Sequence, residues 1–116
     1  MNSAPPARMH EPIPPGTLDM LVLQTLARQG ELHGFAIADA IQQASADVLR
    51  VEEGSLYPAL QRLLMKGWVA GTWGRTAENR RARYYRLTGA GRRQLGREVE
   101  SYRRVSLAIE RILQPA

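Results

Sequence analysis

The sequence predicts a mainly helical α+β fold, in which a small two-stranded β-hairpin follows three helices and precedes a long fourth helix. The segment before the hairpin is a short amphipathic helix that places four leucines on one face: Leu56, Leu60, Leu63 and Leu64. Two strand-like segments then flank a polar, arginine-rich loop. Helix, strand, basic loop and strand is the order of a winged helix-turn-helix, and an apolar heptad stripe marks the last helix as suited to dimerisation.

Size and composition restrict the class of protein. At 116 residues the chain has room for one small domain with an appendage, and oligomerisation would help it bury a core. The 44% hydrophobic content argues against global disorder. The absence of Cys removes disulfides and thiolate metal ligands and fits a cytoplasmic protein. No apolar run approaches the roughly 18 residues of a membrane span, and the N-terminus lacks the apolar core of a signal peptide.

The positive charge is concentrated in one part of the chain. The formal net charge is +5, but residues 62–97 hold ten cations and the single anion Glu78, whereas the other 80 residues hold six cations and ten anions. An arginine run is ordinarily a solvated surface. Here fifteen of the sixteen cations are Arg, which suits planar contacts with phosphate and guanine better than Lys does. The charge pattern therefore favours double-stranded DNA as a partner.

The first half of the chain divides into an arm and two helices. Residues 1–15 are rich in Pro and small residues without periodicity, so we expect a flexible N-terminal arm before a winged helix-turn-helix domain at 16–88. Thr17 can cap a first helix that stops at Gly30. A second helix is expected over 34–45, with its apolar residues facing inward.

The leucine-rich helix and the hairpin complete the domain. If Ser55 caps the helix, Pro58 falls in the first turn, where its missing N–H removes no intrahelical bond. Gly67 ends the helix. Strands are expected at 68–73 and 83–87, joined by a polar loop with Gly and Asn as turn formers.

The remaining segment, 89–116, is predicted to be a C-terminal dimerisation helix, capped by Thr88 and ending near Leu113. A single helix beyond a small domain cannot bury a long apolar stripe against its own core, so a two-fold partner would supply the missing surface. The residues expected at this dimer interface are Leu95, Val99, Tyr102, Val105, Ile109 and Ile112.

Four motifs, in this order, resemble the PadR family of transcriptional regulators. They are GTLDMLVL at 16–23, HGFAI at 33–37, EGSLYPAL at 53–60 and RYYRLT at 83–88, the last leading to Gly91. The short tail resembles that of the small subgroup with one C-terminal helix. The sequence at 51–55 and 79–85 is most similar to that of the acidobacterial-type branch. The resemblance implies a homodimeric DNA-binding regulator, usually a repressor.

Nine residues are the expected DNA contacts, with the helix in the major groove of a pseudo-palindromic operator and the loop at phosphates or the minor groove. They are Ser55, Tyr57, Pro58, Gln61, Arg62, Arg75, Arg80, Arg81 and Arg83. The resemblance carries the DNA-facing role onto Ser55, Tyr57 and Pro58, and matches the wing only as a basic loop. Three alternatives stay open: Tyr57 as a core aromatic, Ser55 as a helix cap, and Arg62 as a solvated residue.

Four further residues have expected roles outside the DNA contacts. His33 is expected to be structural, because two separated histidines without Cys make no metal site, and we expect neither a metal nor another cofactor. Trp68 and Trp73 are expected to pack rather than to form a ligand platform. Tyr102 is expected in the dimer core. The alternative is that it lines a site for a small apolar or aromatic effector, which the resemblance implies because PadR-family proteins often respond to such compounds.

The sequence does not predict an enzyme, because it offers neither a nucleophile–base set nor a phosphate-binding glycine loop. The rival function is a winged-helix module that binds protein and not DNA. Five arginines beside one acid in the region 75–86 disfavour that alternative.

Overall fold

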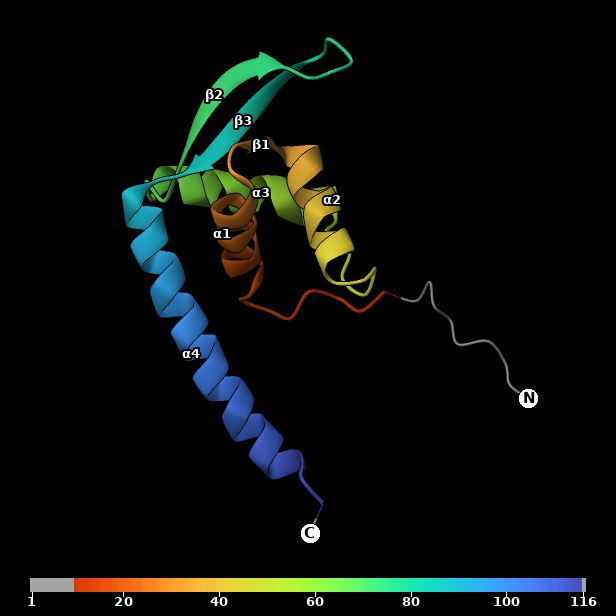
Figure 1. The fold of residues 1–116 in the computed structure, drawn as a ribbon, viewed down its shortest axis with the longest axis vertical. Coiled ribbons are helices and arrows are strands. Elements are labelled where there is room, and N and C mark those ends of the chain that lie inside the picture. Colours follow the sequence, from red (N-terminus) through yellow and green to blue (C-terminus); the bar gives the residue numbers. More distant parts are fainter. Residues whose placement is uncertain (1–9, 116) are drawn as a thin grey trace, which may run out of the picture.

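The computed structural model describes residues 10–115, which form four helices and a three-stranded antiparallel sheet. In chain order the elements are α1 (Leu18–Gln29), β1 (Leu32–His33), α2 (Gly34–Ala44), α3 (Glu53–Met65), β2 (Val69–Arg75), β3 (Arg81–Leu87) and α4 (Gly89–Leu113). Helices α1 to α3 form one body, with the hairpin of β2 and β3 at one end and α4 projecting away from it (Figure 1). The radius of gyration is 16.3 Å, whereas a compact domain of this length has about 13 Å.

The first helix lies close to its predicted bounds. It begins after Thr17, but the Thr17 hydroxyl donates to the carbonyl of Pro14 at 2.7 Å and does not cap the helix N–H groups. It ends at Gly30, whose φ of 84° is one that a glycine adopts without strain. The Gly30 N–H donates to the carbonyl of Leu26, which closes the last turn.

Helix α3 begins earlier than predicted. The carbonyl of Glu52 accepts hydrogen bonds from the backbone N–H of both Ser55 and Leu56, so the first turn starts at Glu53. Ser55 is therefore inside the helix and makes no side-chain cap, so the alternative in which it caps α3 is wrong. Pro58 lies beyond the first turn, where its ring removes one backbone hydrogen bond from the helix.

The sheet has one strand more than predicted. Strands β2 and β3 pair from Val69 opposite Leu87 to Arg75 opposite Arg81, which makes the hairpin longer than expected. The two residues of β1 add a third strand on the other side of β3, with His33 opposite Tyr84. The prediction of a two-stranded hairpin was incomplete, because two residues between Gly30 and α2 are too few to show strand periodicity.

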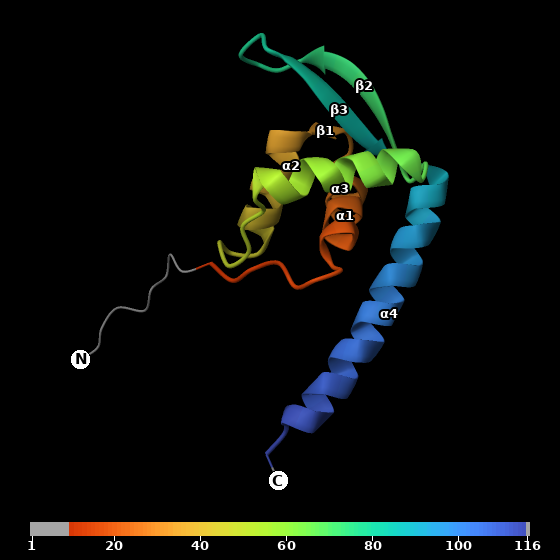
Figure 2. The ribbon, with the colours of Figure 1, turned by 180° about the vertical axis from the view of Figure 1, so that it is seen from behind.

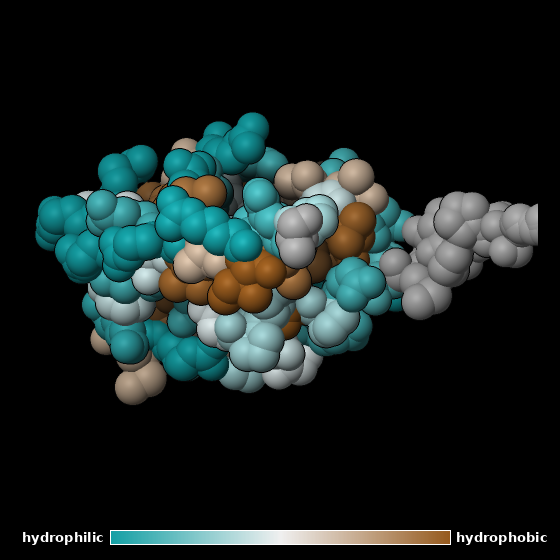
Figure 3. Space-filling view, turned by 90° about the horizontal axis from the view of Figure 1, so that it is seen from below, coloured by the Kyte–Doolittle hydropathy of each residue, from teal (hydrophilic) through white to brown (hydrophobic). Residues whose placement is uncertain are grey.

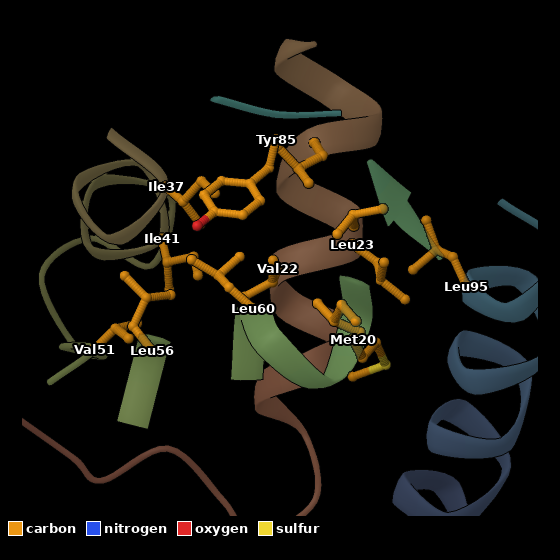
Figure 4. Close-up of a cluster of buried hydrophobic side chains, with 13 residues drawn as sticks. Met20, Val22, Leu23, Ile37, Ile41, Val51, Leu56, Leu60, Tyr85 and Leu95 are labelled. Atoms are coloured by element: carbon orange, nitrogen blue, oxygen red, sulfur yellow. The ribbon is translucent and has the colours of Figure 1, made fainter. Parts of the chain in front are cut away.

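The hydrophobic core lies between α1, α2, α3 and the base of the hairpin, and one turn of α4 closes its side (Figure 4). The predicted leucine stripe of α3 is confirmed in the core, because Leu56, Leu60 and Leu63 are fully buried. The core residues are Met20, Val22, Leu23, Leu26, Ile37, Ile41, Val51, Leu56, Leu60, Leu63, Val69, Tyr85 and Leu95.

A cluster of hydrogen bonds joins the end of α3, the hairpin and α4. The Thr88 hydroxyl donates to the carbonyl of Gly67 at 2.7 Å and accepts from the N–H of Gly91 at 3.0 Å, which confirms Thr88 as the cap of α4. The Thr88 N–H donates to the carbonyl of Trp68. Gly91 packs so closely on this carbonyl that an added Cβ would lie 1.9 Å from its oxygen.

The end of the predicted N-terminal arm is tied to the body, while residues 1–9 lie outside the described part of the chain. The Glu11 N–H donates to the carbonyl of Val48 at 2.8 Å, and His10 contacts the Asp47 carboxylate at 3.2 Å. Hydrogen bonds from Gln42 and then His10 lower the pKa of Asp47. None of the described helices has the length and hydrophobicity that a membrane span requires.

Because of the close contact at Gly91, we expect substitution by alanine to change stability very differently at Gly91 and at Gly96 of α4. Gly91→Ala should lower the free energy of unfolding by about 2 kcal/mol, because the Trp68 backbone must move. Gly96→Ala meets no atom within 4 Å and should instead stabilise the helix by about 0.5–1 kcal/mol. Urea unfolding followed by circular dichroism measures both, and equal effects at the two positions would contradict the packing described here.

Candidate nucleic-acid interface

Helix α3 crosses in front of α1 and α2, with the hairpin above it (Figure 2). Its outer surface carries Ser55, Pro58 and Gln61, all of them exposed as predicted. Met65 continues this line, four residues beyond Gln61, and is 85% exposed. Sequence reasoning missed Met65, although its helical spacing from Pro58 and Gln61 places it on the same face.

Tyr57 lies outside the core, so the alternative of a core aromatic is wrong. Its side chain is 46% exposed, yet its ring lies against the start of α2. A Cβ added at Gly34 would lie 2.9 Å from the Tyr57 hydroxyl oxygen. Gly34 therefore provides the space in which the ring rests, and one side of the ring stays open to solvent.

Arg62 is held at the other flank of α3. Its guanidinium donates to the Asp19 carboxylate of α1 at 2.9 Å, with the Arg62 side chain half exposed. Arg62 is therefore neither fully solvated nor without a partner. An exposed ion pair of this kind contributes little stability.

One face of the hairpin is buried at its base and exposed at its tip. Residues directly opposite each other on paired strands share a face, so the register groups Tyr85 and Gly71 with Trp73 and Arg83 farther along. Tyr85 is buried, and burial raises the pKa of its phenol. Trp73 is 60% exposed. The face thus changes from core at the base to an aromatic and basic surface at the tip.

Trp73, expected to be a packing residue, lies outside the core and packs against arginines, whereas Trp68 is half buried at the edge of the core. The Arg81 guanidinium lies 4.4 Å from the centre of the Trp73 ring, and the Arg83 guanidinium 5.9 Å. Both distances are within the reach of a cation–π contact. Trp68 and Trp73 lie five positions apart in the predicted strand, so alternation places them on opposite faces, and Trp73 also borders the polar loop.

A concave surface connects the hairpin to the helices and encloses a volume of about 730 Å³. It is lined by Phe35 of α2, Tyr57 of α3 and Trp73 of β2, and by three of the predicted wing arginines: Arg80, Arg81 and Arg83. Arg75 lies outside this lining, with its guanidinium donating to the Asn79 carbonyl at 3.1 Å. The surface therefore brings a predicted helix residue and wing residues together. Phe35 was not predicted as part of it.

The wing arginines outnumber the acids of this surface, since Glu78 is the one carboxylate in its lining. Between residues 10 and 115, the ion pairs are His10–Asp47 and Arg62–Asp19, so no carboxylate pairs with an arginine of the hairpin. His33 has a structural position, with its ring edge-on to Tyr84 at 5.4 Å. The described residues contain no group of three or more potential metal ligands. This surface offers cations, rings and hydrogen-bond donors, which suit an anionic partner with flat groups.

The predicted dimer residues divide into two groups along α4. Leu95 is 7% exposed and belongs to the core of its own chain, and Val99 packs partly against that core. These two residues have little surface left for a partner. The farther residues are exposed, with Ile112 at 81%. The exposed set is Tyr102, Val105, Ile109 and Ile112, together with Leu107 and Leu113.

The architecture and sequence of this chain match a known protein family. Residues 22–97 match the model of the transcriptional regulator PadR-like family, which is well over half of the chain. The chain belongs to the PadR-like family of transcriptional regulators. Members of this family are transcription regulators and not enzymes, which confirms the prediction from the sequence.

Relatives of this PadR-like chain include a protein of Streptomyces fradiae, described as an uncharacterized 37.1 kDa protein in transposon TN4556. The two are 47% identical over 87 residues, which covers 75% of this chain and 23% of that protein. The chain therefore spans less than a quarter of the length of this relative.

Solved structures share the fold of this PadR-like chain. A PadR family transcriptional regulator from Eggerthella lenta has a TM-score of 0.73 and 27% identity, over 87% of this chain and 85% of that one. A transcriptional regulator from Clostridium thermocellum has a TM-score of 0.77 and 24% identity, over 85% of this chain and 95% of that one. The second likeness concerns the fold alone.

The exposed Asp19–Arg62 pair should add little to stability. Asp19→Asn removes the charge but keeps the shape, and we expect the free energy of unfolding to change by less than about 1 kcal/mol. Thermal unfolding at low and high salt measures this change. A loss of several kcal/mol would mean that Arg62 is a structural residue and is not available to another anion.

Proposed function

We propose that the chain is a cytoplasmic DNA-binding transcriptional regulator that acts as a homodimer, most simply as a repressor, at a pseudo-palindromic operator. The observation that carries the proposal is the concave surface shared by α3 and the hairpin, where three arginines without an ion-pair partner among the described residues meet exposed rings. Family membership supports the same function. A winged-helix module that binds only protein would have no need for this arrangement of arginines.

Each protomer would place α3 in the major groove. Ser55, Tyr57, Pro58 and Gln61 lie on its exposed side, and Arg62 at its flank would exchange Asp19 for a phosphate. Arg80, Arg81 and Arg83 would reach phosphates or the adjacent minor groove, and Arg75 would support the loop from its bond to Asn79. Within the family, we assign the chain to the small subgroup with one C-terminal helix and to the acidobacterial-type branch.

The distal half of α4 would form the dimer contact. Seen along α4 from its C-terminal end, hydrophobic residues form a band across the surface between polar ones (Figure 3). An apolar hollow beside α4 is lined by Met20 and Leu21 of α1, Val48 and Leu49, and Tyr102. A second copy of α4 can cover both surfaces, because a two-fold contact uses the same patch on each protomer. A small apolar or aromatic effector would bind in the same groove beside Tyr102.

A salt titration on two kinds of DNA tests the function. Arg80→Ala with Arg81→Ala should weaken binding to operator and random duplexes alike and reduce the salt slope by roughly one unit per lost phosphate contact. Arg86→Ala, on the opposite face of β3, is the matched control and should have a smaller effect. Binding is measured by fluorescence anisotropy, with the operator taken from selection on random duplexes. A wild-type chain that bound no duplex would overturn the proposal.

The reading helix has a separate test. Gln61→Ala or Tyr57→Ala should reduce the difference in binding free energy between operator and random DNA. The expected reduction is about 1–3 kcal/mol if the residue contacts a base. The random-duplex affinity should change little, because neither variant removes a charge. If both variants kept the full preference for the operator, α3 would not be the element that reads the sequence.

The dimer is tested on residues that their own chain leaves exposed. Ile109→Glu with Ile112→Glu should produce a folded monomer, because two carboxylates cannot be buried in an apolar contact without a large cost. Arg104→Glu introduces the same group on the polar face of the helix and should leave the dimer intact. Light scattering gives the mass. A double variant that remained dimeric would refute this interface.

A further inference from the structure

We propose that Trp73 is a positioning residue of the wing, which holds the guanidinium groups of Arg81 and Arg83 in the orientation that DNA requires. The inference rests on the proposed DNA-binding function and deepens it. It gives a role to an aromatic residue that the core does not use and that the binding residues discussed so far do not include.

The first support is the geometry of the hairpin. Trp73 lies directly opposite Arg83 in the strand register, and Arg81 follows two residues away on the same face. The indole is 4.4 Å from the Arg81 guanidinium and 5.9 Å from that of Arg83. One ring therefore serves two cations that would otherwise repel each other, because its face is the negative end of the ring quadrupole.

The second support is the way Arg83 is held. A Cβ added at Gly71 would lie 2.7 Å from the Arg83 Nε, so this side chain lies flat on the backbone of β2 where glycine leaves room. Among the described residues, the Arg83 Nε is buried and has no hydrogen-bond partner. An unpaired buried donor costs free energy. Contact with Trp73 and Gly71 offsets that cost and fixes the direction of the remaining N–H groups.

The third support is exposure. Trp73 is 60% exposed and lines the same concave surface as Arg80, Arg81 and Arg83. Such a position gives the indole little part in folding. Arginine side chains lose rotamer entropy when they bind, and a pair already held against a ring loses less of it. Trp73 thus raises affinity through the two arginines.

Trp73→Leu and Trp73→Phe test the inference. Leucine keeps an apolar side chain without a π face, and we expect binding to operator and random duplexes to weaken about three- to tenfold. Phenylalanine keeps a ring and should restore affinity to within about twofold of the wild-type value. Circular dichroism and thermal unfolding should show both variants folded, as expected for an exposed residue. Equal affinity of the Leu variant and the wild type would overturn the inference and leave the proposed function standing.

A double-mutant cycle separates positioning from direct contact. In a chain that already carries Arg81→Ala and Arg83→Ala, Trp73→Leu should change affinity by less than about twofold, because no guanidinium remains to be held. A full loss in that background would mean that the indole itself contacts DNA, and it would overturn the positioning role. A wild-type chain without affinity for any duplex would overturn both proposals, so the two failures are distinct.

Discussion

Burial of α1 is the constraint on which the other parts depend. This helix contacts α2, α3, β3 and α4, and Val22, Leu23 and Leu26 are almost completely buried among them. Since every neighbour packs on the same twelve residues, the directions of α3 and α4 are fixed relative to each other through α1. The surface that carries the arginines and the helix that carries the exposed apolar stripe are thus set by one core.

The same face of the hairpin contributes to the core at its base and carries arginines at its exposed tip. At its base, Val69 and Tyr85 complete the core, and alternation along each strand then requires the next residues on that face to point the same way. Beyond the edge of the helices there is nothing left to bury, and Trp73 with Arg81 and Arg83 occupies these positions. The buried base thereby holds the exposed tip in a defined orientation over α2 and α3.

The strong periodic patterns of the sequence predicted the helices, the hairpin and the exposed line Ser55, Pro58 and Gln61. Three features could not be predicted, each for a physical reason. The strand β1 consists of two residues, fewer than any pattern needs. The start of α3 depends on backbone bonds to Glu52 and not on a capping side chain. The contacts of Arg62 with Asp19 and of Arg81 with Trp73 are tertiary, so spacing along the chain does not reveal them.

The joint around Thr88 gives α4 the mechanical character of a lever. A few hydrogen bonds connect the end of α3, the start of β2 and the first turn of α4. The backbones approach closely there because Gly91 has no side chain. A helix of 25 residues is about 37 Å long, so a tilt of roughly 10° at this joint moves its far end by about 6 Å. In a homodimer built through α4, that displacement would become a change in the separation of the two reading helices. Substitutions at the joint could therefore retune the spacing of an operator while every DNA-contacting residue stays the same.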